Sequence, residues 1–361
     1  MAAKYRQLAD ILREQLPELV NHGASKLPTE AELCLTHGVS RQTVRHALSI
    51  LEEEGYISRR QGSGSHIRRR NTSGDVRQIA VISSFIDDYI FPTILHDAQN
   101  AFARSGYSTL IYSTENRVST EREILTGLLS RPVSGILIEG SKSALPTPNE
   151  DLYRRLRANG IPILFLHGMY SNLSGFPCIY DDNCAGGYQL TSYLVRKGHR
   201  RLAAVFKSDD VQGPQRYQGM VNALRDADIS IPDTNICWYD TEQRRSLIDN
   251  RDSSFIDDIL KKRLGNATAV ICYNDEIAHA LIQRALELGK RVPEDLAVVS
   301  FDNSYYSQIG PVPITSLGHK EQRSRNNRTG CLAAQTLLDM LNGQTVNSFV
   351  LEWDLIERQS G

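Results

Sequence analysis

The chain has 361 residues, which is too long for one typical domain and suits two or three. Its composition, 40% hydrophobic and 23% charged, is that of a globular protein and excludes a disordered chain. No apolar run approaches the ~18–20 residues of a membrane span, and residues 1–6 lack the apolar stretch of a secretory signal. We therefore expect a cytoplasmic protein with no membrane partner. The net charge of −1 conceals an asymmetry, because residues 1–70 carry 11 basic and 8 acidic side chains and the remainder carries 30 and 34.

The spacing of the cysteines and the absence of the common cofactor motifs predict that the protein does not use metal or cofactor chemistry. The cysteines form no C-x-x-C pair and have no spacing with histidine that suits zinc, so we expect free thiols at Cys34, Cys178, Cys184, Cys237, Cys272 and Cys331. There is no G-x-G-x-x-G after a predicted strand, no G-x-x-x-x-G-K-[ST] phosphate loop, no G-x-S-x-G elbow and no lysine in a pyridoxal-phosphate setting. The sequence predicts a protein that is not an enzyme and has no cofactor.

Residues 4–67 have the pattern of a helix-turn-helix followed by a small hairpin. Apolar residues at helical spacing predict a first helix that ends near Pro17, with an apolar face made of Tyr5, Leu8, Ile11, Leu12 and Leu16. Thr29 and Glu32 form a capping box for a second helix, which we expect to stop near Gly38. Ser40 caps a third helix whose inner face consists of Val44, Ala47, Leu48 and Leu51.

The outer face of the third helix is polar and basic. Arg41 and Arg45 are four residues apart in its N-terminal half, where a recognition helix meets base edges, and an arginine fork can read guanine O6 and N7 together. Residues 56–60 and 65–68 read as two strands of a wing, joined by a small turn that can approach phosphates. For the two arginines alone, a solvated helix face is the alternative interpretation.

This segment resembles the winged-helix domain of the GntR family. The resemblance covers residues 4–67 and rests on Leu27-Pro28-Thr29-Glu30, Gly38-Val39-Ser40-Arg41, Thr43-Val44-Arg45, Ala47-Leu48, Glu54-Gly55 and Arg60-Gln61-Gly62-Ser63-Gly64. It implies binding to double-stranded DNA, with Arg41 and Arg45 on bases and phosphates. The further contacts that it implies are Lys4, Tyr5, Glu30, Ser40, Gln42, Thr43, Gln61 and Gly62.

A polar, basic and glycine-containing segment, residues 69–76, predicts a linker between a DNA-binding domain at 1–68 and a second domain at 77–361. Arginines at 68–70 either lie near phosphate or form a solvated run. Beyond the linker, short β-branched runs alternate with helical segments, which predicts parallel α/β sheets, and the length favours two lobes. We expect strands at 79–83, 109–112, 135–138, 162–166, 202–206, 269–272 and 296–300. We expect helices at 94–105, 186–197, 217–227, 276–288 and 329–341.

The predicted strands end in polar and aromatic side chains. Open parallel sheets bind ligands beyond the carboxyl ends of their strands. Those ends fall at residues 83–92, Glu139, His167, 207–210, 273–275 and 302–303. Carboxylates and amides hydrogen-bond hydroxyl groups, Arg216 adds donors, and aromatic rings cover the apolar face of a sugar. The set therefore predicts a neutral polyol as ligand.

Residues 77 to about 358 resemble the effector domains of the LacI/GalR family, which share the fold of periplasmic sugar-binding proteins. The resemblance rests on Lys197-Gly198-His199-Arg200-Arg201, Asp209-Asp210, Arg216 to Gly219, Cys272-Tyr273-Asn274-Asp275, Val292-Pro293-Glu294-Asp295, Phe301-Asp302 and Ile314-Thr315-Ser316. It implies that Arg216, Asn274 and Asp302 hold sugar hydroxyls. The other pocket residues that it implies are Tyr89, Phe91, His167, Lys207, Asp210 and His319.

A GntR-type head on such a body resembles the arabinose repressors of Gram-positive bacteria. This resemblance rests on Asp88-Tyr89-Ile90-Phe91-Pro92, Lys142-Ser143-Ala144-Leu145 and Phe206-Lys207, and it implies a pentose effector, L-arabinose. Residues 320–328 depart from the pattern, since they are more charged than the helix start that the family has there. In place of the DNA-reading hinge helix of the LacI relatives, this chain has the linker.

Several polar residues have structural interpretations beside the functional ones. Asp275 is expected to cap the helix that begins near residue 276 rather than to touch ligand. Asp181 and Asp182 are expected to be caps or hinge residues, and His199 to be structural.

Together these patterns predict a homodimeric, sugar-responsive repressor. Two winged helices would bind the half-sites of a near-palindromic operator, and closure of the lobes on the sugar would release the DNA. Another sugar or a nucleoside is the alternative effector. A GntR-type head fused to an aminotransferase-like enzyme is the alternative of a different class, which the missing cofactor lysine argues against, and a transport protein is contradicted by the missing signal peptide.

Overall fold

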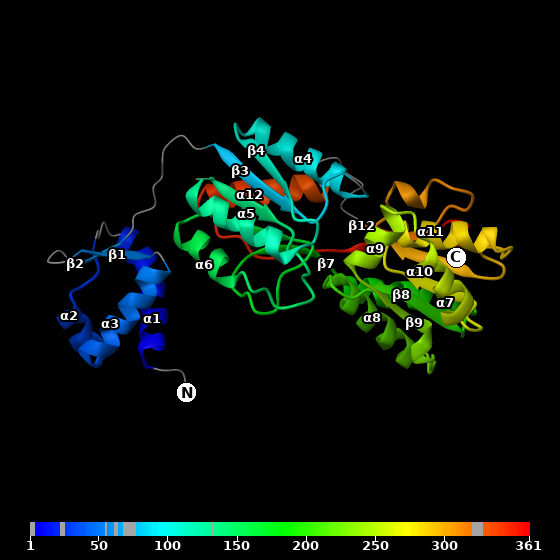
Figure 1. The fold of residues 1–361 in the computed structure, drawn as a ribbon, viewed down its shortest axis with the longest axis horizontal. Helices are drawn as coiled ribbons and strands as arrows, with labels where there is room; N and C mark the ends of the chain where they lie inside the picture. Colours follow the sequence, from blue (N-terminus) through cyan, green and yellow to red (C-terminus); the bar gives the residue numbers. More distant parts are fainter. Residues whose placement is uncertain are drawn as a thin grey trace. The chain divides into compact units, whose positions relative to one another are not determined.

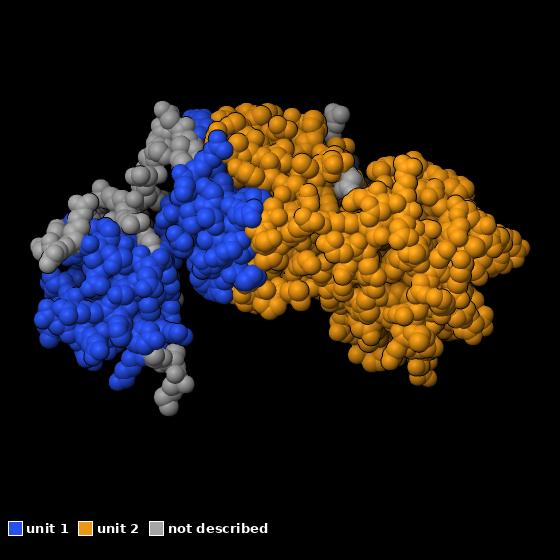
Figure 2. Space-filling model, viewed as in Figure 1, with its two compact units in different colours: residues 1–77, 122–134, 148–162 blue, residues 78–121, 135–147, 163–361 orange. Residues whose placement is uncertain are grey.

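The computed structural model describes residues 4–21, 26–54, 56–60, 64–67, 77–87, 89–131, 133–319 and 328–361. Contacts divide the chain into two compact units, residues 1–77, 122–134 and 148–162, and residues 78–121, 135–147 and 163–361 (Figure 2). The predicted linker lies outside the described residues, and the domain limits 1–68 and 77–361 stay a prediction.

The N-terminal segment forms three helices and a two-stranded antiparallel hairpin, as the sequence predicts (Figure 1). These elements are α1 (Lys4–Asn21), α2 (Glu30–His37), α3 (Arg41–Glu53), β1 (Ile57–Arg60) and β2 (Gly64–Ile67). A small core joins the helices to the hairpin through Leu8, Leu12, Leu33, Val44, Leu48, Leu51 and Ile57. Burial of these side chains supplies the stability that three short helices lack in isolation.

The helix boundaries follow the predicted caps. Thr29 Oγ1 accepts from the backbone N–H of Glu32 (3.3 Å), and the Glu32 carboxylate accepts from the backbone N–H of Thr29 (2.7 Å). Gly38 ends α2 with a left-handed φ of 61°. Ser40 Oγ accepts from the backbone N–H of Thr43 (3.2 Å) and starts α3. The turn between α2 and α3 is thus fixed by local chemistry.

Two expectations for α1 are wrong. The helix continues through Pro17 to Asn21, because Leu16 is buried and Leu19 packs against the core beyond the proline, which offsets one missing hydrogen bond. Ile11 is 44% exposed and does not belong to the inner face, where Ala9 lies instead.

The first lobe is built on a six-stranded parallel sheet of order β13-β7-β6-β5-β3-β4. Its strands are β3 (Gln78–Ser83), β4 (Ser108–Ser113), β5 (Gly135–Ile138), β6 (Ile163–Leu166), β7 (Cys178–Asp181) and β13 (Phe349–Leu351). Apolar side chains of α4 (Phe91–Arg104) and α12 (Thr329–Leu341) share one core with this sheet. In chain order α5 (Val118–Ser130) follows β4, and α6 (Glu150–Ala158) follows β5.

The second lobe is built on a sheet of order β14-β12-β11-β10-β8-β9, parallel except for β14. Its strands are β8 (Leu202–Lys207), β9 (Ile236–Tyr239), β10 (Ala269–Cys272), β11 (Ala297–Phe301), β12 (Thr315–His319) and β14 (Trp353–Ile356). Its helices are α7 (Asn183–Arg196), α8 (Gln212–Asp226), α9 (Thr241–Ile248), α10 (Ser254–Asp258), a π-helical turn at Ile259–Arg263 and α11 (Asp275–Glu287). The prediction of parallel α/β sheets in two lobes is confirmed.

The chain passes between the lobes three times, from β7 to α7, from β12 to α12 and from β13 to β14. All three crossings involve strands at one edge of each sheet. β13 and β7 lie at this edge of the first sheet, and β14 and β12 lie at this edge of the second. The opposite edges are β4 and β9.

Within the described part of the chain, no helix is both long enough and apolar enough to cross a membrane. The six cysteines, all of them described, have free thiols.

Candidate functional site

The carboxyl ends of the strands of both sheets surround one cavity, as open parallel sheets predict. The cavity contains about 650 Å³ of space free of protein atoms, part of it open to solvent. All nine residues that the sequence analysis selected for ligand binding line it: Tyr89, Phe91, His167, Lys207, Asp210, Arg216, Asn274, Asp302 and His319. The structure thus brings the predicted set together, and the role of these residues in binding stays a prediction.

Arg216, on α8, is buried at the centre of the cavity wall. Its Nε donates to Asn183 Oδ1 (2.9 Å), its Nη1 donates to the Tyr273 carbonyl, and its Nη2 lies 3.2 Å from Asp302 Oδ1. The guanidinium also lies 4.1 Å from the centre of the Phe301 ring. Burial lowers the pKa of Arg216, but Asp302 and neighbouring groups raise it above its ordinary value overall. The side chain is therefore a charged, rigid donor at this wall.

Tyr89 and Asp302 meet across the cavity from different lobes. The Tyr89 hydroxyl donates to Asp302 Oδ2 (2.6 Å) and accepts from the backbone N–H of Asp275 (3.3 Å). Both residues have left-handed backbones, with φ of 59° at Tyr89 and 90° at Asp302, a conformation that clusters at functional sites. Burial and the nearby Asp302 carboxylate raise the pKa of Tyr89 well above its ordinary value, so the phenol remains a donor.

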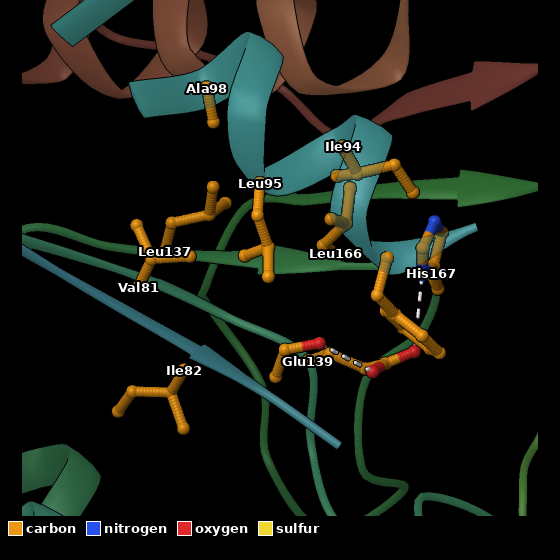
Figure 3. A pocket seen from close by; sticks show the side chains of 11 residues that line it. Val81, Ile82, Ile94, Leu95, Ala98, Leu137, Glu139, Leu166 and His167 are labelled. Atoms are coloured by element: carbon orange, nitrogen blue, oxygen red, sulfur yellow. Dashed lines mark hydrogen bonds and ion pairs between the residues drawn. The ribbon is translucent and has the colours of Figure 1, made fainter. Parts of the chain in front are cut away.

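His167 and Glu139 form a buried pair at the ends of β6 and β5. His167 Nδ1 lies 3.1 Å from Glu139 Oε1, and the other carboxylate oxygen accepts from the backbone N–H of Ser84 (3.1 Å). Figure 3 shows the pair at one end of a small apolar pocket next to α4. Burial lowers the pKa of His167, but the Glu139 carboxylate raises it above its ordinary value overall. Burial raises the pKa of Glu139, and His167 lowers it below its ordinary value overall.

Lys207 and two aspartates form the next part of the wall. The ammonium of Lys207, at the end of β8, donates to Asp210 and lies 3.1 Å from Asp209 Oδ1. Asp209 is held from behind, since its Oδ2 accepts from the backbone N–H of Thr241 (3.1 Å). Lys207 is 2% exposed, so its charge is compensated entirely by protein groups.

His319, at the end of β12, closes the cavity next to the crossings between the lobes. Its Nε2 lies 2.9 Å from Asp181 Oδ1, and its ring stacks on Trp353 with 4.5 Å between centroids. Asp182 accepts from the backbone N–H of Ala185 (2.9 Å) and caps α7, so its expected capping role is confirmed. Asp181 is a buried partner of His319 at the first crossing.

The expected cap of α11 is wrong by one residue. Asn274 Oδ1, not Asp275, accepts from the backbone N–H of Ile277 (3.1 Å) and caps the helix. The Asp275 carboxylate accepts instead from Ser316 Oγ (2.7 Å) and from the backbone N–H of Ser304 (2.6 Å). Asn and Asp cap helices equally well, so sequence could not choose between adjacent residues. The Asn274 cap uses Oδ1, which leaves its Nδ2 as the atom that can serve a ligand.

Arg244 is a wall residue that the sequence analysis missed. On α9, its Nε and Nη2 pair with the two carboxylate oxygens of Glu276 (2.8 and 2.7 Å), and its guanidinium lies 4.3 Å from the centre of the Phe85 ring. Tyr239 and Tyr273 also line the cavity. The strand β9, which carries Tyr239 and precedes Arg244, was not predicted, and this is why both were missed. His199 is 2.9 Å from Thr268 Oγ1, in keeping with a structural role.

The second candidate site is the outer face of the helix-turn-helix. The Glu30 carboxylate lies 3.0 Å from Arg41 Nε, 3.1 Å from Arg45 Nε and 3.4 Å from Arg59 Nη2. The side chains of Arg41 and Arg45 are 71% and 57% exposed, so they are paired yet accessible. Burial raises the pKa of Glu30, but Arg41 and Arg45 lower it below its ordinary value overall.

The other described residues among those predicted to contact DNA have these surroundings. Tyr5 is edge-on to His46 of α3, with 5.5 Å between ring centroids, and Ser40 Oγ is 2.8 Å from Thr43 Oγ1. Lys4 and Gln42 are exposed. Gln61 and Gly62, at the predicted wing tip, lie outside the described residues. Arg59 of β1 joins the same cluster and was not selected from the sequence.

Two family models match the chain. Residues 4–67 match the one for bacterial regulatory proteins of the gntR family, and residues 191–361 match the one for a periplasmic binding protein-like domain. The arabinose metabolism transcriptional repressor of Halalkalibacterium halodurans is 33% identical over 325 residues, 88% of this chain and 85% of the relative. The protein of the same name from Geobacillus stearothermophilus is 33% identical over 340 residues, 93% of this chain and 91% of the relative. The crystal structure of the transcription regulator CcpA of Lactococcus lactis has the same fold, with a TM-score of 0.66 and 23% identity over 79% of this chain and 99% of that one.

Proposed function

This chain belongs to the family of transcriptional repressors that join a GntR-type DNA-binding domain to a LacI-type, periplasmic-binding-protein-like domain, and from this premise we propose that it releases its operator when L-arabinose enters the cavity. The two relatives at 33% identity are transcriptional repressors, and they confirm the expectation that the protein is not an enzyme. In the proposed cycle a homodimer binds two half-sites through its winged helices, and the lobes hold the sugar.

The observation that carries the sugar assignment is the charge pairing of the cavity wall. Among the described residues that line the cavity, each basic side chain lies against a carboxylate. The pairs are Lys207 with Asp210, Arg216 with Asp302, Arg244 with Glu276, His167 with Glu139, and His319 with Asp181. Such a wall offers both donors and acceptors but no surplus positive charge, so it suits hydroxyl groups better than a phosphate or a carboxylate.

The choice of L-arabinose is supported by the names of the two relatives at 33% identity. The lining of the cavity is compatible with a monosaccharide, because small-molecule pockets combine apolar and aromatic walls with a few placed polar groups. The rings of Phe85, Phe91, Tyr239 and Tyr273 provide such walls here.

Thermal unfolding in the presence of sugars tests the effector. A ligand that binds only the folded protein stabilises it by about 2.7 kcal/mol at 100 times its Kd, so saturating L-arabinose is expected to raise Tm clearly. D-arabinose, D-ribose, an arabinose phosphate and adenosine are the matched comparisons. A shift with adenosine or another sugar, and none with L-arabinose, would reassign the effector. A shift with the phosphate alone would overturn the argument from charge pairing.

A titration with operator DNA tests the output. Fluorescence anisotropy of a labelled near-palindromic duplex is expected to show tight binding that L-arabinose weakens, and sedimentation is expected to show two chains per duplex. We propose that Lys4, Tyr5, Glu30, Ser40, Arg41, Gln42, Thr43, Arg45, Gln61 and Gly62 form the DNA-contacting surface. Unchanged operator affinity at saturating sugar would contradict the repressor cycle.

A further inference from the structure

The topology places two loops from different lobes opposite the crossings. The edge strands β4 and β9 lie farthest from the crossings in their sheets. Glu115 and Asn116 follow β4, and Thr241 and Arg245 lie on α9, directly after β9. The cavity thus has the crossings at one side and these two loops at the other.

Asn116 connects the loops through its side chain, which is fully buried. Its Nδ2 donates to Thr241 Oγ1 (2.7 Å) and to Asp210 Oδ1 (3.0 Å), both in the second lobe. Its Oδ1 accepts from the backbone N–H of Lys142 (2.6 Å) in the first lobe. Since Asn116 is absent from the cavity lining, these bonds serve the protein and not a ligand.

Two further contacts join the two lobes. Ser143 Oγ accepts from the backbone N–H of Val211 (3.1 Å), just before α8, the helix that carries Arg216. Arg245 Nη2 donates to the Glu115 carbonyl (2.6 Å). We call Glu115, Asn116, Ser143, Asp210, Val211, Thr241 and Arg245 the interlobe clasp.

We propose that Asn116 is a positioning residue that couples closure of the lobes to the effector-contacting carboxylate of Asp210. Asp210 lines the cavity and is held on both oxygens, by Asn116 on Oδ1 and by Lys207 on Oδ2. Only when the clasp is formed does Asp210 have both partners, so effector affinity depends on a residue that touches no effector. This inference rests on the proposed function and adds to it the residue that sets the population of the closed state.

The backbone of Asn116 decides which substitutions are informative. Its φ is 55°, in the left-handed region that Asn, Asp and Gly tolerate and other residues do not. Asn116→Gly therefore removes the side chain without backbone strain, and Asn116→Asp keeps the shape but sets a carboxylate against Asp210. Asp228→Gly is the matched control, because Asp228 also has a left-handed φ (53°) and follows the opposite end of α8.

Titration calorimetry with L-arabinose gives the first readout. Two interlobe hydrogen bonds, one of them to a charged group, correspond to roughly 10- to 100-fold weaker binding by Asn116→Gly. Asn116→Asp is expected to bind more weakly still at neutral pH and to recover as the pH falls, because protonation of one carboxylate removes the repulsion. A merely structural role would give no such pH profile. Unchanged affinity in both variants would overturn the proposal.

Hydrogen–deuterium exchange gives a readout that does not depend on the sugar. In the full-length protein, the backbone N–H groups of residues 142 and 211 are expected to exchange faster in Asn116→Gly than in the wild type or Asp228→Gly, while the core strands stay unchanged. If the wild type binds no L-arabinose, the proposed effector is wrong, and exchange still decides whether Asn116 holds the clasp. Equal exchange at both amides would overturn the clasp itself.

Discussion

Arg216 makes directional hydrogen bonds as well as an ion pair. Its replacement by lysine, which keeps the charge, is therefore informative. Lysine would keep a cation near Asp302 but could not also serve Asn183 and the Tyr273 carbonyl or stack on Phe301. We expect Arg216→Lys to lose about 2 kcal/mol of sugar binding, roughly 30-fold, with operator binding intact. Calorimetry measures the sugar affinity and anisotropy measures the operator affinity. The control is Arg225→Lys, an exposed position at the far end of α8. Normal induction by Arg216→Lys would remove this residue from the site.

The His167–Glu139 pair predicts how stability depends on pH. His167 has a pKa above 6.5 in the folded protein, so its stabilising contribution is present below pH 6.5 and is lost as the pH rises through the raised pKa. Glu139 has a lowered pKa, so its contribution is present above pH 4.5 and is lost as the pH falls through the lowered value. We expect His167→Gln to abolish the alkaline loss in a series of Tm measurements. A wild-type Tm that does not fall above pH 6.5 relative to His167→Gln would contradict the pair.

At the scale of elements, the sequence predicted helices with strong local signals correctly and missed strands whose signals are weak. The helix-turn-helix could be predicted because its signals are local. They are the capping box at Thr29, the caps at Gly38 and Ser40, and the apolar face of α3. The predicted α12 agrees with the structure residue by residue. The nine ligand candidates line one cavity because each follows a strand with a clear apolar run or lies in a motif of the resembled family.

The strands that the sequence analysis missed are short and depend on tertiary contacts. β9 and β13 are edge strands of four and three residues, and β12 contains Thr315, Ser316 and Gly318, so none has a long apolar run. They exist because neighbouring strands complete their hydrogen bonding. Arg244 and two residues of the interlobe clasp, Thr241 and Arg245, lie on α9 directly after β9, so they could be placed only once the sheet order was known.

The pairing of α2, α3 and β1 through Glu30 leads to a prediction about DNA selectivity. Glu30 holds three guanidinium groups, so Glu30→Gln frees Arg41, Arg45 and Arg59 and removes one negative charge. We expect tighter binding to a scrambled duplex and a smaller ratio of operator to scrambled affinity, measured by anisotropy across a salt series. Glu53→Gln, at the other end of α3, changes the charge equally. If both variants behave alike, Glu30 contributes charge and not orientation.

At the scale of the whole molecule, the crossings and the clasp lie on opposite sides of the cavity, which suits a closing motion of the two lobes about the crossings. Tyr89 with Asp302, and Phe85 with Arg244, join the lobes across the cavity wall itself. The sugar would thus favour one lobe arrangement through contacts to both sides, which is the differential interaction that any ligand-driven shift requires.

Reciprocity makes this coupling measurable from either end. If L-arabinose lowers operator affinity by a factor in the usual range of about 5–150, operator DNA must lower L-arabinose affinity by the same factor. We expect calorimetric titrations of sugar into the protein with and without operator to give the ratio that anisotropy gives for operator with and without sugar. In Arg45→Ala, whose operator binding is expected to weaken by about 1–3 kcal/mol, operator at a concentration too low to bind the variant should leave its sugar affinity unchanged. Sugar affinity that is the same on free and operator-bound wild type would mean that the cavity does not regulate the DNA-binding surface.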